Sequence, residues 1–159
     1  MPSEEEEKKQ KTADELDQLY QGLRVMLPGV QVMFGFLLAA VFAQGFAKTT
    51  DPQRTAFYIA LVSVAVSAIM LMAPSVHHRM LFPHEDPKAL LRRASRYMLI
   101  GTLFVGIALT SGIYMVLDYL FEPALAIATS AAVAVTLVAV WYLAPVLHRS
   151  GAVRHSSKR

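Results

Sequence analysis

Residues 55–76 read TAFYIALVSVAVSAIMLMAPSV, and these 22 positions contain no Asp, Glu, Lys, Arg or His. Because a helix rises about 1.5 Å per residue, this stretch can cross a hydrocarbon layer roughly 30 Å thick. A helix of a soluble bundle would instead carry charged residues along its outer face, at a period near 3.6. The stretch therefore predicts a transmembrane helix.

Three further stretches lack ionisable side chains, at residues 25–47, 97–117 and 123–147. The chain is 55% hydrophobic, its mean hydropathy is +0.42, and its charges are kept out of these stretches instead of being interleaved with them. Nothing in the 159 residues indicates a second domain. We therefore predict an all-α fold, a four-transmembrane-helix bundle that forms one domain over residues 13–149.

The basic residues predict how the helices are oriented. Of 15 basic residues, 13 lie before the first span, between the second and third spans, or after the fourth. The other two, Lys48 and Arg54, share the opposite side with Asp51, Asp118 and Glu122. Since basic residues next to spans are retained in the cytoplasm, we expect a multi-pass protein of the cell membrane with both termini cytoplasmic.

Both ends of the chain are polar. Residues 1–12 are acidic and without periodicity, which predicts a disordered tail, and residues 150–159 form a basic tail. Within Ala13–Arg24, four apolar residues recur at helical spacing, namely Leu16, Leu19, Tyr20 and Leu23. This pattern predicts a short amphipathic helix at the membrane interface. We expect Pro28 to bend the chain after it, because proline donates no backbone hydrogen bond.

The chain also matches itself at a shift of 71 or 72 residues. Residues 24–29 (RVMLPG) return as residues 96–101 (RYMLIG), and residues 73–78 (APSVHH) return as residues 144–149 (APVLHR). The match predicts two tandem helical hairpins, a parallel 2+2 repeat about an axis near the membrane normal. Proline at helix starts and basic residues at cytoplasmic ends would produce part of this similarity without any duplication.

Basic residues cluster next to the central loop. Asp86 is a good N-cap and Pro87 suits the first helical position, so the third helix should begin before the membrane. Such a cluster attracts anionic headgroups by about 1 kcal/mol per basic residue. An acidic partner would use the same charges, whereas nothing selects nucleic acid. The candidate lipid or partner surface consists of Arg79, Lys88, Arg92, Arg93, Arg96 and Arg149.

A second set of candidates lies in or beside the spans. Pro74 and Pro145 each leave one backbone carbonyl without its usual hydrogen bond. The two prolines mark either helix ends or two kinks that line a small hydrated vestibule. The candidate kink and polar positions are Pro28, Gln31, Pro74, His77, Pro145 and His148. Small residues one turn apart predict close helix packing at Ser63 and Ser67, at Gly106 and Thr110, and at Ala124, Ala128 and Ala132.

The sequence carries no signature of known catalysis. It has no phosphate-binding glycine loop, no Gly-x-Ser-x-Gly, no His-Glu-x-x-His and no cysteine. Its five histidines, His77, His78, His84, His148 and His155, do not have the spacing of a helical metal site. We therefore expect no enzyme, no metal and no cofactor. The spans contain no ionisable side chain, which argues against a pump.

At residues 24–38 (RVMLPGVQVMFGFLL) and 73–79 (APSVHHR), the chain resembles a family of small, uncharacterised four-helix bacterial membrane proteins, common in actinobacteria. The resemblance covers roughly residues 13–150 and implies no assigned activity. Some members are labelled sodium:proton antiporters. The spans here lack the carboxylate that such a label implies, and Asp118, at the edge of the third span, would be the only candidate.

These patterns favour a non-enzymatic helical bundle that interacts with lipids, with anionic headgroups on its cytoplasmic side, or with a membrane partner. The alternative is a small ion or solute transporter or channel that works as a homo-oligomer, since four helices alone would hardly enclose a path. A metal or haem protein is the third possibility and depends on the histidines alone.

Overall fold

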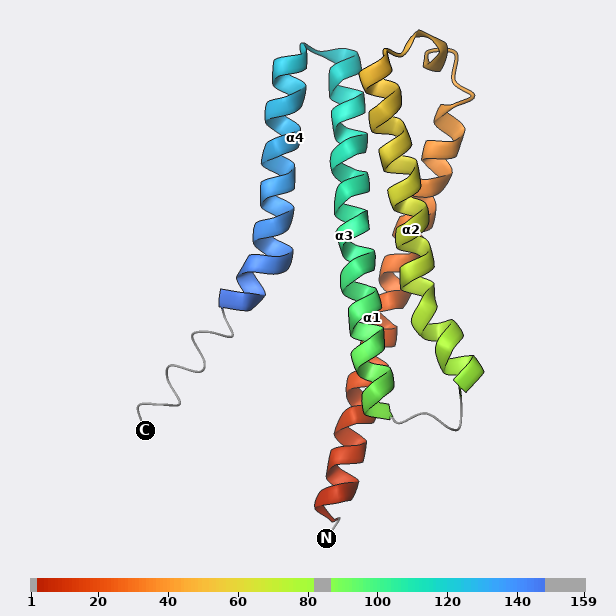
Figure 1. Ribbon diagram of the computed structural model, residues 1–159, viewed down its shortest axis with the longest axis vertical. Coiled ribbons are helices and arrows are strands. Elements are labelled where there is room, and N and C mark those ends of the chain that lie inside the picture. The colour runs from red at the N-terminus through yellow and green to blue at the C-terminus, as the bar shows by residue number, and fades with distance from the viewer. Residues whose placement is uncertain (1–2, 82–86, 148–159) are drawn as a thin grey trace.

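The computed structural model describes residues 3–81 and 87–147, and these residues fold into long helices joined by short connections (Figure 1). The elements are α1 (Glu4–Ala40), the 3-10 turn η1 (Phe46–Lys48), α2 (Asp51–Leu81), α3 (Pro87–Leu120), α4 (Pro123–Val138) and the π-helical turn η2 (Ala139–Leu143). Four helices are long and apolar enough to cross a membrane. The predicted fold class, all-α with four spanning helices, is confirmed, and the chain is a multi-pass membrane protein.

The two ends of the molecule differ in character. The start of α1, the end of α2 and the start of α3 lie at one end, which we call the basic end because it carries Arg79, Lys88, Arg92, Arg93 and Arg96 (Figure 1). The link from α1 to α2 and the link from α3 to α4 lie at the opposite end, which we call the loop end. The charged segments thus lie beyond the apolar part of the helices.

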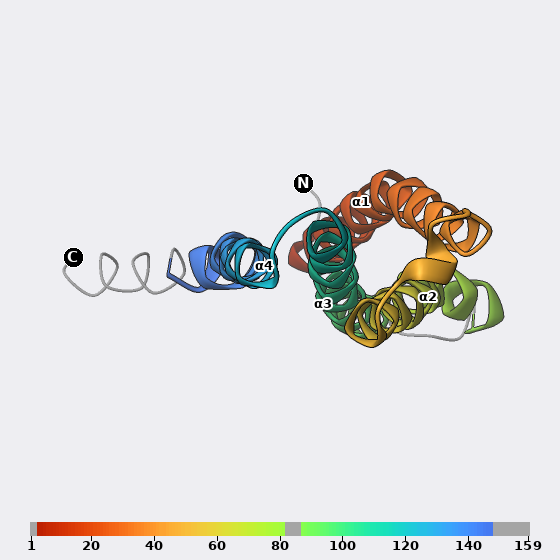
Figure 2. The ribbon, with the colours of Figure 1, turned by 90° about the horizontal axis from the view of Figure 1, so that it is seen from above.

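The four helices do not close a square. The contact between α2 and α3 is the most extensive, α1 packs on both, and α4 packs on α3. Seen from the loop end, α1, α2 and α3 surround a common centre, whereas α4 stands outside this group, next to α3 (Figure 2). The molecule therefore consists of a three-helix unit with a fourth helix on its side.

Small side chains allow the close contact between α2 and α3. A stripe at helical spacing on α2 is buried, and it consists of Ala56, Ala60, Ser63, Ser67 and Leu71. On α3, a Cβ atom at Gly101 would lie 2.7 Å from Cδ2 of Leu71, so only glycine fits this position without a shift. The predicted packing role of Ser63 and Ser67 is confirmed, because both are buried.

The alanines of α4 behave differently. Ala124, Ala128 and Ala132, for which we predicted close packing, are exposed on the single chain. The face of α4 that meets α3 instead includes Ala126 and Ser130, which are buried. At Gly106, a Cβ atom would lie 3.8 Å from Cδ1 of Leu137 on α4, an ordinary contact distance, so α4 lies beside this position but leaves room for a methyl group.

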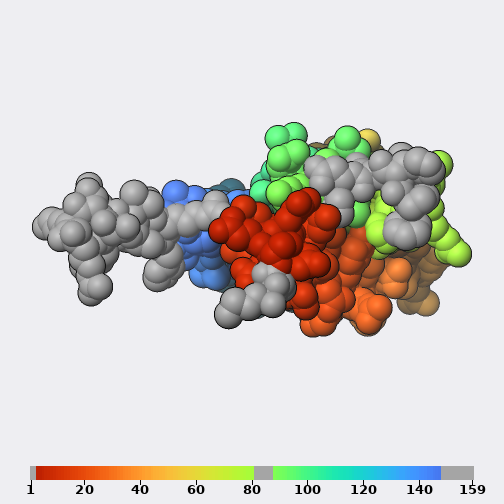
Figure 3. Space-filling model, turned by 90° about the horizontal axis from the view of Figure 1, so that it is seen from below, coloured from red at the N-terminus to blue at the C-terminus, as the bar shows by residue number. Residues whose placement is uncertain are grey.

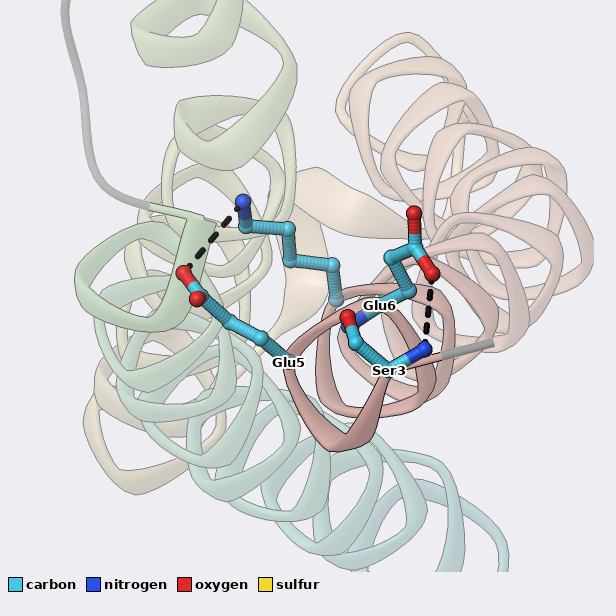
Figure 4. Close-up of polar contacts among 4 residues, drawn as sticks. Ser3, Glu5 and Glu6 are labelled. Atoms are coloured by element: carbon cyan, nitrogen blue, oxygen red, sulfur yellow. Dashed lines mark hydrogen bonds and ion pairs between the residues drawn. The ribbon is translucent and has the colours of Figure 1, made fainter. Parts of the chain in front are cut away.

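The structure differs from the sequence prediction at the start of the chain. We expected residues 1–12 to be a disordered tail, but α1 begins at Glu4. The reason is a capping box: the Ser3 backbone N–H donates to Oε2 of Glu6 at 2.8 Å, and the Glu6 N–H donates to Oγ of Ser3 at 3.4 Å. Figure 4 shows both residues beside Glu5, whose carboxylate pairs with Lys9 at 3.5 Å.

The separate interfacial helix that we predicted within residues 13–24 is also absent. This segment is part of α1, which runs unbroken through Pro28. Its apolar residues Leu19, Tyr20 and Leu23 pack on the core cluster of the protein, where we had expected them to lie against lipid. Leu23 and Val30, on either side of Pro28, are both buried, so both parts of the helix pack on the protein.

The end of the fourth span changes its helix type. After Val138 the chain forms the π-helical turn η2, followed by a last α-helical turn that contains Pro145. Because proline has no N–H, the normal bond to the Trp141 carbonyl is missing, and a π-helical turn widens the helix at this point. The lower part of α4 leans away from α3 in Figure 1.

We predict that Gly101→Ala destabilises the protein by about 1–3 kcal/mol, because the new methyl group overpacks the α2–α3 contact. Leu71 is fully buried, and its Cγ would also lie within 2.8 Å of the added Cβ atom. The matched control is Gly112→Ala on the same helix, where nothing lies within 4 Å of the added Cβ atom. Thermal unfolding in detergent measures both, and equal midpoints for the two variants would contradict the prediction.

Candidate functional site

The first turns of α3 hold the predicted basic surface. Leu90 is 5% exposed and Ala94 is 1% exposed, so this side of the helix packs on the protein. The basic residues Lys88, Arg92, Arg93 and Arg96 lie on the other sides of the same turns and are exposed. The helix begins at Pro87 as predicted, while its expected N-cap Asp86 lies outside the described residues. Because Leu90 and Ala94 face the protein, the basic side chains of these turns face outward.

Other elements complete the basic end. Arg79 on the last turns of α2 is exposed, whereas Arg149 lies outside the described residues. Viewed from this end, the first turns of α1 cover the middle of the face and the green start of α3 lies beside them (Figure 3). Within the described chain, Arg92 and Arg96 take part in no ion pair, while Lys88 and Arg93 make further contacts. Arg92 and Arg96, like Arg79, are thus available to a ligand.

The histidines do not converge. The ring of His77 lies 5.3 Å from that of Tyr97, and the ring of His78 lies 6.0 Å from that of Tyr20. Across residues 3–81 and 87–147, no three His, Asp or Glu side chains lie close enough together to hold a metal ion. His84, His148 and His155 fall outside those ranges. The two described histidines instead connect α2 to α3 and to α1.

The candidate positions in the spans are scattered over different helices. Pro74 is fully buried in α2, whereas Pro145 at the end of the fourth span is exposed. These two helices lie on different sides of α3 (Figure 2), so Pro74 and Pro145 do not line a common vestibule. Pro28 and Gln31 are both exposed on α1. The structure therefore brings none of these positions together into one site.

A polar contact that the sequence reasoning missed joins α2 and α3 at the loop end. Nε2 of Gln53 donates to the backbone carbonyl of Asp118 at 3.1 Å and to its Oδ2 at 3.0 Å. Oε1 of Gln53 accepts from the Thr50 N–H at 3.1 Å. The spacing Thr50-x-x-Gln53 at the start of α2 is a capping-box signal and would have identified this residue. Gln53 is 5% exposed, so this contact is largely shielded from solvent.

Next to this contact, a groove of about 630 Å³ opens between α2, α3 and α4. Its polar lining residues are Asp51, Thr55, Thr110, Ser111, Tyr114 and Ser130. Oγ of Ser130 is buried and finds no hydrogen-bond partner among the residues that the structure describes. The volume suits a small organic molecule. The groove combines apolar walls with a few hydroxyl groups. This lining is typical of a solute site but does not indicate a particular solute.

A second and larger groove, of about 850 Å³, runs along α1 and α3 from Val25 to Ala40 and reaches Trp141. Its lining is almost entirely apolar, with Met, Val, Leu and Phe side chains from both helices. Such a surface is what acyl chains meet on any spanning bundle, since there is no water at this depth. The groove therefore indicates contact with lipid tails and no particular chemistry.

Comparison with known proteins places the chain in a family but gives no activity. No curated protein and no solved structure matches it. One family model, described as a family of unknown function (DUF6328), matches residues 5–145, which includes the four spanning helices and the basic end. The chain therefore belongs to this family, DUF6328.

Proposed function

We propose that this protein acts without catalysis, by holding a basic surface against anionic lipid headgroups or the acidic face of a membrane partner. In this proposal it resides in the cell membrane with both termini and the basic end in the cytoplasm, where 13 of its 15 basic residues would then lie. The opposite loop end has Lys48 and Arg54 together with three acidic residues.

The placement of Arg92 and Arg96 on α3 supports the proposal most directly. Arg96 directly precedes the predicted span 97–117, and Arg92 comes one helical turn earlier, about 6 Å farther from the membrane. Both lie within the depth of the headgroup layer, and both are exposed. Because Leu90 and Ala94 pack on the protein, the backbone that carries the two arginines is ordered before a ligand binds.

We predict that replacing Arg92 and Arg96 together by Gln weakens binding of phosphatidylglycerol roughly 30-fold, since each basic residue near the surface contributes about 1 kcal/mol. Native mass spectrometry of the detergent-solubilised protein, titrated with phosphatidylglycerol or phosphatidylcholine, measures the affinity. Binding of the zwitterionic lipid should not change.

The control carries the same loss of charge on another helix. Lys8→Gln with Lys9→Gln alters the first turns of α1, where each lysine already pairs with a glutamate one turn earlier. This variant should bind phosphatidylglycerol like the unaltered protein. An equal loss in both double variants would show that net charge matters and the Arg92 and Arg96 surface does not.

The loop-end groove favours a second candidate function, a small solute or ion transporter that works as a homo-oligomer. The hydroxyl groups of lining residues such as Thr110 and Ser111 give a polar molecule partners within the apolar part of the bundle. The spans contain no ionisable side chain, however, so a proton or sodium path would need another source of charge. This second candidate therefore ranks below the lipid surface.

If the protein transports a solute, vesicles that contain it should show flux above empty vesicles. Ser130→Leu, which fills the groove, should then lower the flux several-fold. Ala124→Leu on the same helix lies outside the groove and on an exposed face, so it should leave the flux unchanged. Vesicles with intact oligomers and no flux of ions, protons or small polar solutes would remove this candidate.

A further inference from the structure

Gln31 is a polar residue on the outer face of α1. Its neighbour Val30 is 4% exposed and belongs to the core cluster, whereas Gln31 is exposed. Figure 2 shows α1 with one side toward α2 and α3 and the other side at the edge of the molecule. Across the described ranges, 3–81 and 87–147, no residue forms a hydrogen bond with Gln31. The amide group therefore faces the surroundings of the protein.

Those surroundings are hydrocarbon. Gln31 lies seven residues beyond Arg24, which is exposed and directly precedes the uncharged stretch 25–47, and this corresponds to about 10 Å along the helix. Its exposed neighbours Val32 and Phe36 are apolar. A position this far into a layer roughly 30 Å thick lies within the hydrocarbon, about a third of the way across from the basic end.

An amide without partners is costly at this depth, because neither lipid tails nor water can bond to it. An acyl chain covers the surface but leaves both the NH₂ donors and the carbonyl acceptor unpaired. The charged end of the span at Arg24 is about 10 Å away along the helix, which is farther than a Gln side chain extends. The partner must therefore be a polar group of another protein chain within the membrane.

We propose that this partner is Gln31 of a second copy, so that the protein forms a two-fold symmetric dimer through α1. A carboxamide is both donor and acceptor, so two of them related by a two-fold axis can satisfy each other. Such bonds across helices are a common cause of association in membranes. No other chain is needed to explain the position of Gln31.

The backbone next to Gln31 allows a second helix to come close. Gly35 follows one turn later on the same face, and nothing lies within 4 Å of a Cβ atom built on it. Ala39, another turn on, is also small and exposed. Small residues at this spacing let two helices approach closely. The polar group and the small residues thus share one face of α1, which α2, α3 and α4 leave uncovered.

Energy transfer between donor-labelled and acceptor-labelled protein in lipid vesicles, measured over a range of protein-to-lipid ratios, tests the dimer. Gln31→Leu should weaken dimerisation at least about tenfold, and Gln31→Asn, which keeps the carboxamide, should retain most of it. The matched control is Gln44→Leu, the same change at the loop end, where water and headgroups are within reach. Unaltered protein that stays monomeric would overturn the proposal, as would an unchanged Gln31→Leu variant or an equal loss in Gln44→Leu.

Cross-linking locates the interface independently, because the chain has no cysteine of its own. A disulfide needs two Cα atoms within about 7 Å, so Gly35→Cys should cross-link when the vesicles are oxidised. The control position is Val135 on α4, which is apolar and 68% exposed. The Val135→Cys variant should stay monomeric. Cross-linking at Val135 with none at Gly35 would show that copies meet through α4, and the α1 dimer would be wrong. Neither experiment depends on the proposed lipid surface.

Discussion

The close contact between α2 and α3 is the interaction on which the rest of this molecule depends. Lipid tails are as apolar as leucine, so helices in a membrane gain nothing from burying apolar surface as such and associate through close packing and hydrogen bonds. Here the packing comes from the small side chains of Ser63 and Ser67 and from Gly101, which leaves room for Leu71. At the loop end, the bonds from Gln53 to Asp118 add a polar contact between the same two helices.

The basic end follows from this pair of helices. Because α2 and α3 continue as helices beyond the apolar segments, α1 can pack on both of them there, through contacts such as that between Tyr20 and His78. The buried residues Leu90 and Ala94 set the rotation of α3 in this region. The direction in which Arg92 and Arg96 point is therefore a consequence of helix packing and not of the charges themselves.

Several polar side chains in the spans are satisfied within the chain, whereas the buried hydroxyl groups of Ser67 and Ser130 have no hydrogen-bond partner among the described residues. Thr110 and Thr136 donate to backbone carbonyls one turn earlier, at 2.9 and 2.8 Å, and the hydroxyl groups of Thr102 and Tyr142 lie 3.3 Å apart between α3 and α4. Gln31 differs from all of these, because its side chain is longer and faces outward. A polar group that the fold leaves unsatisfied in hydrocarbon is best explained by something outside the single chain.

Local sequence signals determined much of this structure. Runs of more than 20 residues without charge define the four spans, because no other environment suits them. The capping box at Ser3 and the bond from the Thr50 N–H to Gln53 mark the starts of α1 and α2, although the acidic character of residues 4–7 obscured the first. The amphipathic pattern around Leu19 and Leu23 showed that an apolar face is covered, but such a pattern is the same whether lipid or protein covers it.

Only the tertiary structure decided which face of each span lies inside. A soluble helix marks its outer face with charge, whereas a spanning helix is apolar on every side, so sequence alone does not separate buried Val30 from exposed Gln31. For the same reason, the sequence alone did not show that α4 lies beside α3 instead of closing a square with the other helices. It also did not show that Pro74 and Pro145 lie apart. Composition determined that the helices are in the membrane, and packing alone determined what each of them touches there.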